Sequence, residues 1–206
     1  MEQLDAKQRW EERYAESDRI WSGRPNARLV EVAPGLTPGR ALDLGCGEGG
    51  DTVWLAEHDW HVVAVDIADA ALARAAELAA SRNVLDRIEF QQHNLTETFP
   101  QGSFDLVSAH FLHSPWDWDR DALLRRAADA VAPGGTLLIV DHGEAPPWAK
   151  GVHDHRFPSV TEVLDGLALD AAQWERVRVE QSEREAQGPD GQSGTLIDNV
   201  IVLRRR

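Results

Sequence analysis

The chain has 206 residues, of which 42% are hydrophobic and 27% charged, a composition typical of one folded domain rather than a disordered chain. A formal net charge of −14 argues against binding nucleic acid, which requires a basic surface, and no apolar run approaches the roughly 20 residues that span a bilayer. The single cysteine excludes an intrachain disulfide framework, and the acidic start lacks the features of a secretory signal, so we expect a cytoplasmic protein.

The first part of the chain predicts two helices with a break between them. Residues 4–17 form a charged amphipathic pattern in which Trp10 and Tyr14 share one face. Residues 21–26 contain glycine and proline and predict a turn, and residues 27–32 continue as a helix. The spacing of Trp10 and Tyr14 favours packing of the first helix against the rest of the protein.

The most informative segment is an apolar strand pattern, residues 41–44, that runs into a glycine-rich turn. The glycines of this turn tolerate backbone angles closed to other residues and let a ligand approach the main chain. They precede a helix predicted over residues 51–58, whose positive end would face the same ligand. The sequence therefore predicts a small-ligand site on this turn.

The glycine spacing alone leaves the ligand open. Gly45, Gly47 and Gly50 satisfy the dinucleotide fingerprint, which favours a nicotinamide-dependent oxidoreductase. Asp43, two residues before the first glycine, offers nothing to a pyrophosphate but suits a cationic ligand. Asp66 ends the second strand pattern, where a carboxylate can accept both hydroxyls of a ribose.

Strand and helix patterns alternate through the rest of the chain. We predict further strands at residues 62–65, 87–91, 106–109 and 136–140, and helices at residues 70–81 and 120–131. A Pro-Gly-Gly turn precedes the fifth strand, and a short helix is predicted over residues 159–167. Strand patterns at residues 174–183 and 195–203 flank a strong turn signal and predict an antiparallel hairpin. The sequence thus predicts an α/β fold, doubly wound around a mainly parallel seven-stranded sheet with a C-terminal antiparallel hairpin.

Together these strings resemble the class I S-adenosylmethionine-dependent methyltransferases over residues 40–141. The resemblance rests on Asp43 with the Gly-x-Gly-x-Gly turn, on Asp66, and on the string Phe104-Asp105-Leu106-Val107 in the fourth strand. It implies S-adenosylmethionine as the cofactor.

The resemblance also implies roles for single residues. The backbone of Gly45, Cys46 and Gly47 would face the methionine portion of the cofactor, with Asp43 near its ammonium group. Asp66 would hold the ribose hydroxyls. Around the adenine, the contacts would come from Ile67, Asn94 and Leu95, with Asn94 accepting from the adenine amine where a carboxylate is commoner.

The N-terminal aromatic residues are similar to those of tellurite-resistance and thiopurine methyltransferases, where such residues cover the cofactor. The similarity implies that Trp21 belongs to a lid. The expected organisation is one methyltransferase domain over residues 1–206, with an N-terminal helical lid region at residues 1–38 and the sheet core at residues 39–206.

Candidate residues for the chemistry follow the fourth strand, because ligands of open α/β sheets sit beyond the carboxyl ends of strands. His110 and His113 are candidates for contact with cofactor or acceptor and for proton transfer, with neither assigned a catalytic role. Cys46 reads better as a small residue in a tight turn than as a nucleophile. Residues 153–156 hold two histidines without a clear third ligand, so no metal site is predicted, and the role of this cluster stays open.

The sequence therefore predicts a methyltransferase that acts on a small-molecule acceptor by in-line methyl transfer. An NAD(P)-dependent oxidoreductase and a non-catalytic S-adenosylmethionine-binding module are the alternatives. The expected partner is the methyl acceptor, with no nucleic acid and no membrane. A monomer and a homodimer both stay open, as does the identity of the acceptor.

Overall fold

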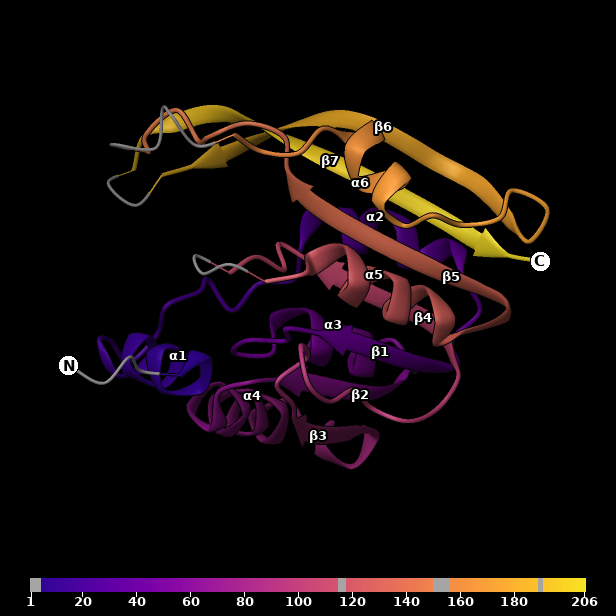
Figure 1. Cartoon of the computed structure of the whole chain (residues 1–206). Helices are drawn as coiled ribbons and strands as arrows, with labels where there is room; N and C mark the ends of the chain where they lie inside the picture. The colour runs from indigo at the N-terminus through magenta and orange to yellow at the C-terminus, as the bar shows by residue number, and fades with distance from the viewer. Residues whose placement is uncertain (1–4, 115–117, 150–155, 189–190) are drawn as a thin grey trace.

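The computed structural model describes residues 5–114, 118–149, 156–188 and 191–206, and they fold around one seven-stranded sheet (Figure 1). The strand order is β3-β2-β1-β4-β5-β7-β6. The strands are β1 (Arg40–Leu44), β2 (His61–Asp66), β3 (Ile88–Gln92), β4 (Phe104–His110), β5 (Val131–His142), β6 (Trp174–Gln187) and β7 (Ser193–Arg205). The first five strands pair in parallel, and β7 is antiparallel to both β5 and β6. The predicted doubly wound sheet with its C-terminal hairpin is confirmed.

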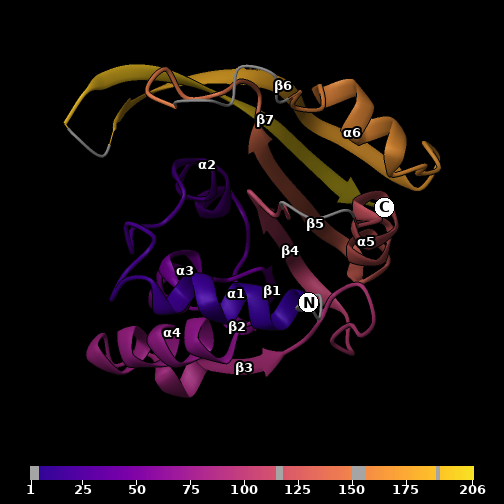
Figure 2. The same ribbon diagram turned by 60° about the vertical axis from the view of Figure 1, so that its left-hand side comes forward.

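Helices cover both faces of the sheet, as Figure 2 shows. The helices are α1 (Ala6–Ala15), α2 (Ala27–Val32), α3 (Gly50–Glu57), α4 (Asp69–Ser81), α5 (Arg120–Asp129) and α6 (Val160–Gly166), with short 3-10 turns η1 (Ala33–Gly35) and η2 (Leu85–Arg87). The first four helices lie to one side of the sheet and α5 and α6 to the other.

The apolar residues of the parallel strands alternate between two cores. In β2, Val63 and Val65 join the cluster that includes Leu123 and Leu124 of α5, while Val62 joins the cluster under α2 and α3. Successive side chains of a strand point to opposite faces, so a strand covered on both faces is apolar throughout. This explains the continuous apolar patterns from which the strands were predicted.

The first helix packs onto the start of α4. Asp5 caps α1 in a reciprocal capping box with Gln8. Tyr14 is buried with Ala68 and Ala71, and Trp10 packs beside it. Trp10 and Tyr14 therefore pack against the rest of the protein, as their four-residue spacing predicts.

The helix predicted over residues 120–131 is too long. α5 ends at Asp129, and Val131 already pairs with Phe104 of β4. The pairing then shifts before it resumes between Leu106 and Thr136, and Gly134 has a φ of +80° within this irregularity. The Pro-Gly-Gly sequence therefore lies within this irregularity of β5, and the strand begins at Val131 instead of after the turn.

Candidate active site

The turn after β1 lies at the carboxyl edge of the sheet and depends on glycine. Gly45, Gly47 and Gly49 have φ values of +70°, +52° and +85°, a region that other residues rarely adopt. A Cβ atom on Gly49 would lie 2.8 Å from the Cβ of Ala75, so α4 packs directly against the turn. The Cys46 amide donates to the carbonyl of Val65 at 2.8 Å, which ties the turn to the end of β2.

Asp66 is joined to the same turn. Its Oδ2 accepts from the amide of Gly47 at 2.9 Å, and its Oδ1 accepts from the amide of Ala68 at 3.0 Å. Burial raises the pKa of Asp66, and these amides oppose the rise. The structure therefore places a fixed carboxylate beside the glycine backbone, with half-buried Ile67 next to it.

A polar cluster lies beneath the turn. Asp43 is 2% exposed, and its Oδ2 accepts from the Thr52 hydroxyl at 2.6 Å. Burial and the neighbouring charge of Asp51 raise the pKa of Asp43 to about 6. Asp51, in the first turn of α3, accepts from the amide of Asn26 and lies 2.6 Å from Nδ1 of His110.

His110 ends β4, and its side chain is 5% exposed. Its Nε2 is buried and has no hydrogen-bond partner within residues 5–114, 118–149, 156–188 and 191–206. Burial lowers the pKa of His110, but Asp51, together with Asp43 and Asp141, outweighs burial and raises it.

Residues 16–26, between α1 and α2, form a covering segment that is bound to the glycine turn through Glu48. This carboxylate is 4% exposed and accepts from the amides of Ile20 and Trp21, the latter at 2.9 Å, and from the Arg74 guanidinium at 2.7 Å. Burial raises the pKa of Glu48, and these donors outweigh burial and lower it. Arg74 also donates to the carbonyl of Tyr14 at 2.7 Å. The sequence interpretation missed both ionic residues, although Glu48 is the only acid inside the glycine turn.

Trp21 lies beside the turn and is 46% exposed. Its indole nitrogen donates to the Tyr14 hydroxyl at 3.2 Å, and a Cβ on Gly47 would lie 3.3 Å from the Trp21 ring and from that hydroxyl. Burial and the charge of Asp66 raise the pKa of Tyr14, so its hydroxyl stays protonated at neutral pH. Tyr14 thus packs against α4 and also reaches the site, which its spacing does not predict.

The loop after β4 folds over the turn from the other side. Phe111 has a φ of +49°, an uncommon value for a residue with a side chain. A Cβ on Gly45 would lie 2.6 Å from Cδ1 of Leu112, and Arg120 donates to the Leu112 carbonyl at 2.9 Å. Arg120 also donates to Asp141, the buried carboxylate near the end of β5.

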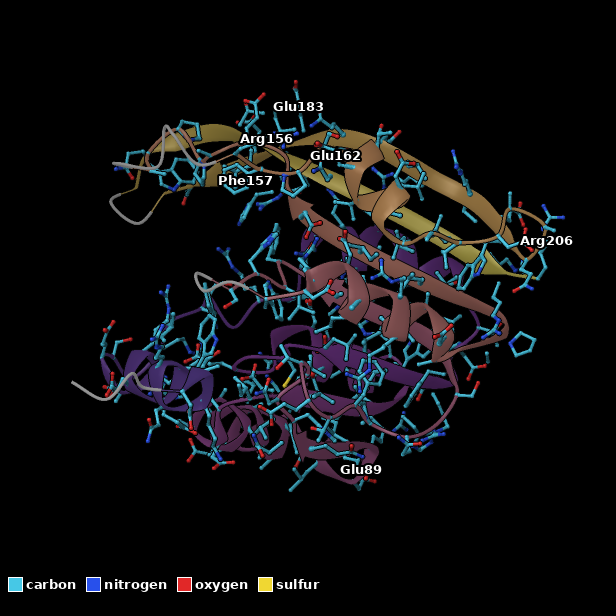
Figure 3. All side chains as sticks on the ribbon, viewed as in Figure 1. Glu89, Arg156, Phe157, Glu162, Glu183 and Arg206 are labelled. Atoms are coloured by element: carbon cyan, nitrogen blue, oxygen red, sulfur yellow. The ribbon has the colours of Figure 1, made fainter. Side chains whose placement is uncertain are left out.

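His113, the second candidate histidine, lies near Asp141, whereas His110 lies near Asp51. His113 Nε2 is 3.3 Å from Asp141 Oδ1, which Arg120 also contacts. The ring of Phe111 stacks on His142 with centroids 4.3 Å apart, and Phe157 meets His142 edge-on at 5.9 Å. Figure 3 shows Phe157 beneath the hairpin of β6 and β7. Aromatic and imidazole rings therefore gather at the carboxyl ends of β4 and β5.

Leu95 and Asn94, two of the residues predicted to contact the adenine, differ in their surroundings. Leu95 is buried, but the Asn94 amide oxygen accepts from both the amide and the hydroxyl of Thr96, so an adenine amine would have to displace one of these.

Burial raises the pKa of the Cys46 thiol well above its usual value, which agrees with a small packed residue and not with a nucleophile. The described residues hold no cluster of three or more histidine, cysteine or acidic side chains suited to a metal, and residues 153–155 lie outside them.

Comparisons with known proteins agree with this geometry. A family model described as "Methyltransferase domain" matches residues 41–135. Thiocyanate methyltransferase 1 of Arabidopsis thaliana is 30% identical over 152 residues, which are 69% of this chain and 67% of that protein. The chain belongs to the class I S-adenosylmethionine-dependent methyltransferases. The cofactor of this methyltransferase is therefore S-adenosylmethionine, and the family is not that of the nicotinamide-dependent alternative.

Other matches are more partial. The 27-O-demethylrifamycin SV methyltransferase of Amycolatopsis mediterranei is 34% identical over 122 residues, which are 55% of this chain and 44% of that protein. The first curated relatives of the methyltransferase are matched over less than half of their own length. None of the helices in the described parts of the chain is long and apolar enough to cross a bilayer.

Solved structures support the fold. A protein studied for the conversion of a disulfide bond into a thioacetal group during echinomycin biosynthesis superposes with a TM-score of 0.74 and 22% identity, over 98% of this chain and 92% of that one. TehB from Haemophilus influenzae superposes with a TM-score of 0.70 and 17% identity, over 95% and 67% of the two chains. At these identities the likeness concerns the fold alone.

Proposed function

We propose that this methyltransferase transfers the methyl group of S-adenosylmethionine to a small-molecule acceptor by in-line displacement at the sulfonium. The observation that carries the proposal is the joining of Asp66 to the glycine turn through the Gly47 amide, with Asp43 buried below. A ribose would bind Asp66, the methionine portion would lie on the backbone of Gly45 to Gly47, and the ammonium would lie near Asp43. Ile67, Asn94 and Leu95 would surround the adenine.

The chemistry asks mainly for positioning. The leaving thioether is neutral, so it needs no proton, and holding the acceptor in line while excluding water supplies much of the rate. Residues 1–38 act in this proposal as a lid region on the sheet core of residues 39–206. The bonds from Glu48 to the amides of Ile20 and Trp21 support this division, because they hold the covering segment on the glycine turn itself.

A small acceptor is supported by charge and by the relatives. The net charge of −14 is unfavourable for a polyanionic nucleic acid. The names of two relatives, a thiocyanate and a demethylrifamycin methyltransferase, refer to small molecules. The ring cluster of Phe111, His142 and Phe157 at the ends of β4 and β5 is the expected acceptor surface.

Binding and turnover test this proposal. Calorimetry is expected to show binding of S-adenosylhomocysteine and no binding of NAD(H) or NADP(H). Incubation with S-adenosylmethionine and a panel of small nucleophiles is expected to yield S-adenosylhomocysteine together with a methylated product. Binding without turnover across a broad panel would favour a non-catalytic module, and tight nicotinamide binding would contradict the proposal.

The lid role of Trp21 has its own test. Because Trp21 is 46% exposed, Trp21→Ala is expected to raise the dissociation constant of S-adenosylhomocysteine and to change the unfolding free energy of the empty protein by only about 1 kcal/mol or less. Trp60 is the matched control, since it is 1% exposed. Trp60→Ala is expected to lower stability by about 3–5 kcal/mol. A large loss of stability in Trp21→Ala with unchanged affinity would make Trp21 a packing residue.

A further inference from the structure

We propose that His110, held by Asp51, is the general base of the reaction, and that the acceptor is therefore a hydroxyl or amine that must lose a proton. This inference rests on the proposed methyl transfer. It separates such acceptors from nucleophiles that carry no proton, such as a halide ion.

The pairing of His110 with Asp51 is the first observation. Nδ1 of His110 lies 2.6 Å from Asp51 Oδ2, and Asp51 is itself held by the amide of Asn26. A carboxylate bonded to one ring nitrogen fixes the ring and its tautomer and leaves the other nitrogen available for a proton. Asp51 is thus the positioning residue, and Nε2 is the atom that would receive the proton.

The state of Nε2 is the second observation. It is buried and lacks a hydrogen-bond partner throughout the described parts of the chain. A buried polar atom left without a partner costs about 1–3 kcal/mol, so its persistence calls for a specific reason. An acceptor proton that arrives only with the substrate provides that reason.

The place of His110 in the fold is the third observation. β1 and β4 are neighbours, and the strand order reverses between them, as the order β3-β2-β1-β4-β5 shows. Ligands of doubly wound sheets bind beyond the carboxyl ends of the strands at this switch point. His110 is the last residue of β4, and its neighbour Ala109 pairs with Leu44, directly before the glycine turn.

The other histidines at this edge suit the role less well. Asp141, which lies 3.3 Å from His113, is also bound by the Arg120 guanidinium, and this positive charge weakens its support of an imidazolium. Burial lowers the pKa of His142, whose ring stacks on Phe111. The largest charge effects on His110 come from three carboxylates: Asp51 from α3, Asp43 from β1 and Asp141 from β5.

The proton balance of the step is simple. As the acceptor oxygen or nitrogen attacks the methyl carbon, its bond to hydrogen breaks and the proton moves to Nε2. The carbon–sulfur bond breaks toward sulfur and gives the neutral thioether. The resulting imidazolium is stabilised by Asp51 and later releases its proton to water.

The activity test uses His110→Gln with His61→Gln as the matched control. Glutamine can still donate to Asp51 but cannot take a proton, and His61 is an exposed residue at the opposite end of the strands. With phenol and aniline as probes, His110→Gln is expected to lower kcat about 10²- to 10⁴-fold. Transfer to iodide and affinity for S-adenosylhomocysteine are expected to stay within about threefold, or roughly 0.65 kcal/mol. Equal losses for all probes and for cofactor affinity would make His110 a cofactor contact and overturn the proposal.

A second measurement needs no acceptor. Nitrogen-15 NMR of histidine-labelled full-length protein saturated with S-adenosylhomocysteine reports the protonation of each ring nitrogen. At pH 8.5, His110 is expected to carry its proton on Nδ1 and a free lone pair on Nε2, and Asp51→Asn is expected to lower its pKa. A proton on Nε2 at this pH would overturn the proposal, whereas failure of the protein to bind S-adenosylhomocysteine would instead contradict the proposed function.

Discussion

Replacement of Asp66 by alanine is expected to weaken S-adenosylhomocysteine binding by roughly 2–4 kcal/mol, or about 30- to 900-fold, because two charge-assisted bonds to the ribose hydroxyls are lost. Asp66→Asn keeps the shape but removes the charge and one acceptor oxygen, so its NH2 group would face one of the two backbone amides that Asp66 accepts from. Isothermal titration calorimetry of both variants measures the effect.

The same substitution has a structural cost that must be measured separately. Asp66 accepts from the amides of Gly47 and Ala68, so alanine leaves two donors of a buried turn without their partner. We expect the unfolding free energy to fall by about 1–3 kcal/mol while the protein stays folded. A folded Asp66→Ala protein with wild-type affinity would show that the ribose binds elsewhere.

Asp43→Asn is expected to stabilise the empty protein at neutral pH and to weaken cofactor binding. Burial, with the charge of Asp51 beside it, raises the pKa of Asp43 from 3.8 to about 6, so the ionised form is disfavoured in the folded state. Asparagine removes the need to keep a charge at a site that is 2% exposed. Opposite changes in stability and affinity are typical of residues that serve a ligand.

The ionisation of Asp43 determines how the expected change in stability depends on pH. Below about pH 3 the carboxyl group is protonated in both the folded and the unfolded state, and it affects stability little. As the pH rises through the unfolded value of 3.8 toward the folded value of about 6, the unfolded chain loses its proton first, and the folded state loses at most about 3 kcal/mol of stability relative to the unfolded state. The gain from Asp43→Asn is therefore expected to be small at pH 4 and full above pH 7, as urea denaturation at both values would show. Equal gains at both values would rule out this cause.

The sequence predicted the elements because their signals are local. The apolar strands, the glycine turn and the capped helices are each encoded by a short stretch of sequence. Asp43 and Asp66 belong to two such strands, β1 and β2, which are neighbours in the sheet. The predicted end of α5 is wrong because the pairing of Val131 with Phe104 is a contact between distant parts of the chain, which a local pattern does not reveal.

The contacts that complete the site escaped prediction for the same reason. Arg74 and Glu48 are 26 residues apart, and His110 and Asp51 are 59 apart. No periodicity links such residues, because only the register of the sheet and the packing of α3 and α4 bring them together. The sequence could name His110 as a candidate, but it could not show that a carboxylate holds the ring.

The insertion of β7 between β5 and β6 has a consequence for how the protein is made. β7 follows both β5 and β6 in the sequence, yet it is the antiparallel partner of both strands. At a synthesis rate of about 5–20 residues per second, β5 emerges several seconds before its partner. During that interval its outer edge is unpaired, and the apolar segment around Leu138 and Ile139 is open to association with other nascent chains. Completion of the sheet must therefore wait until β7 has been synthesised.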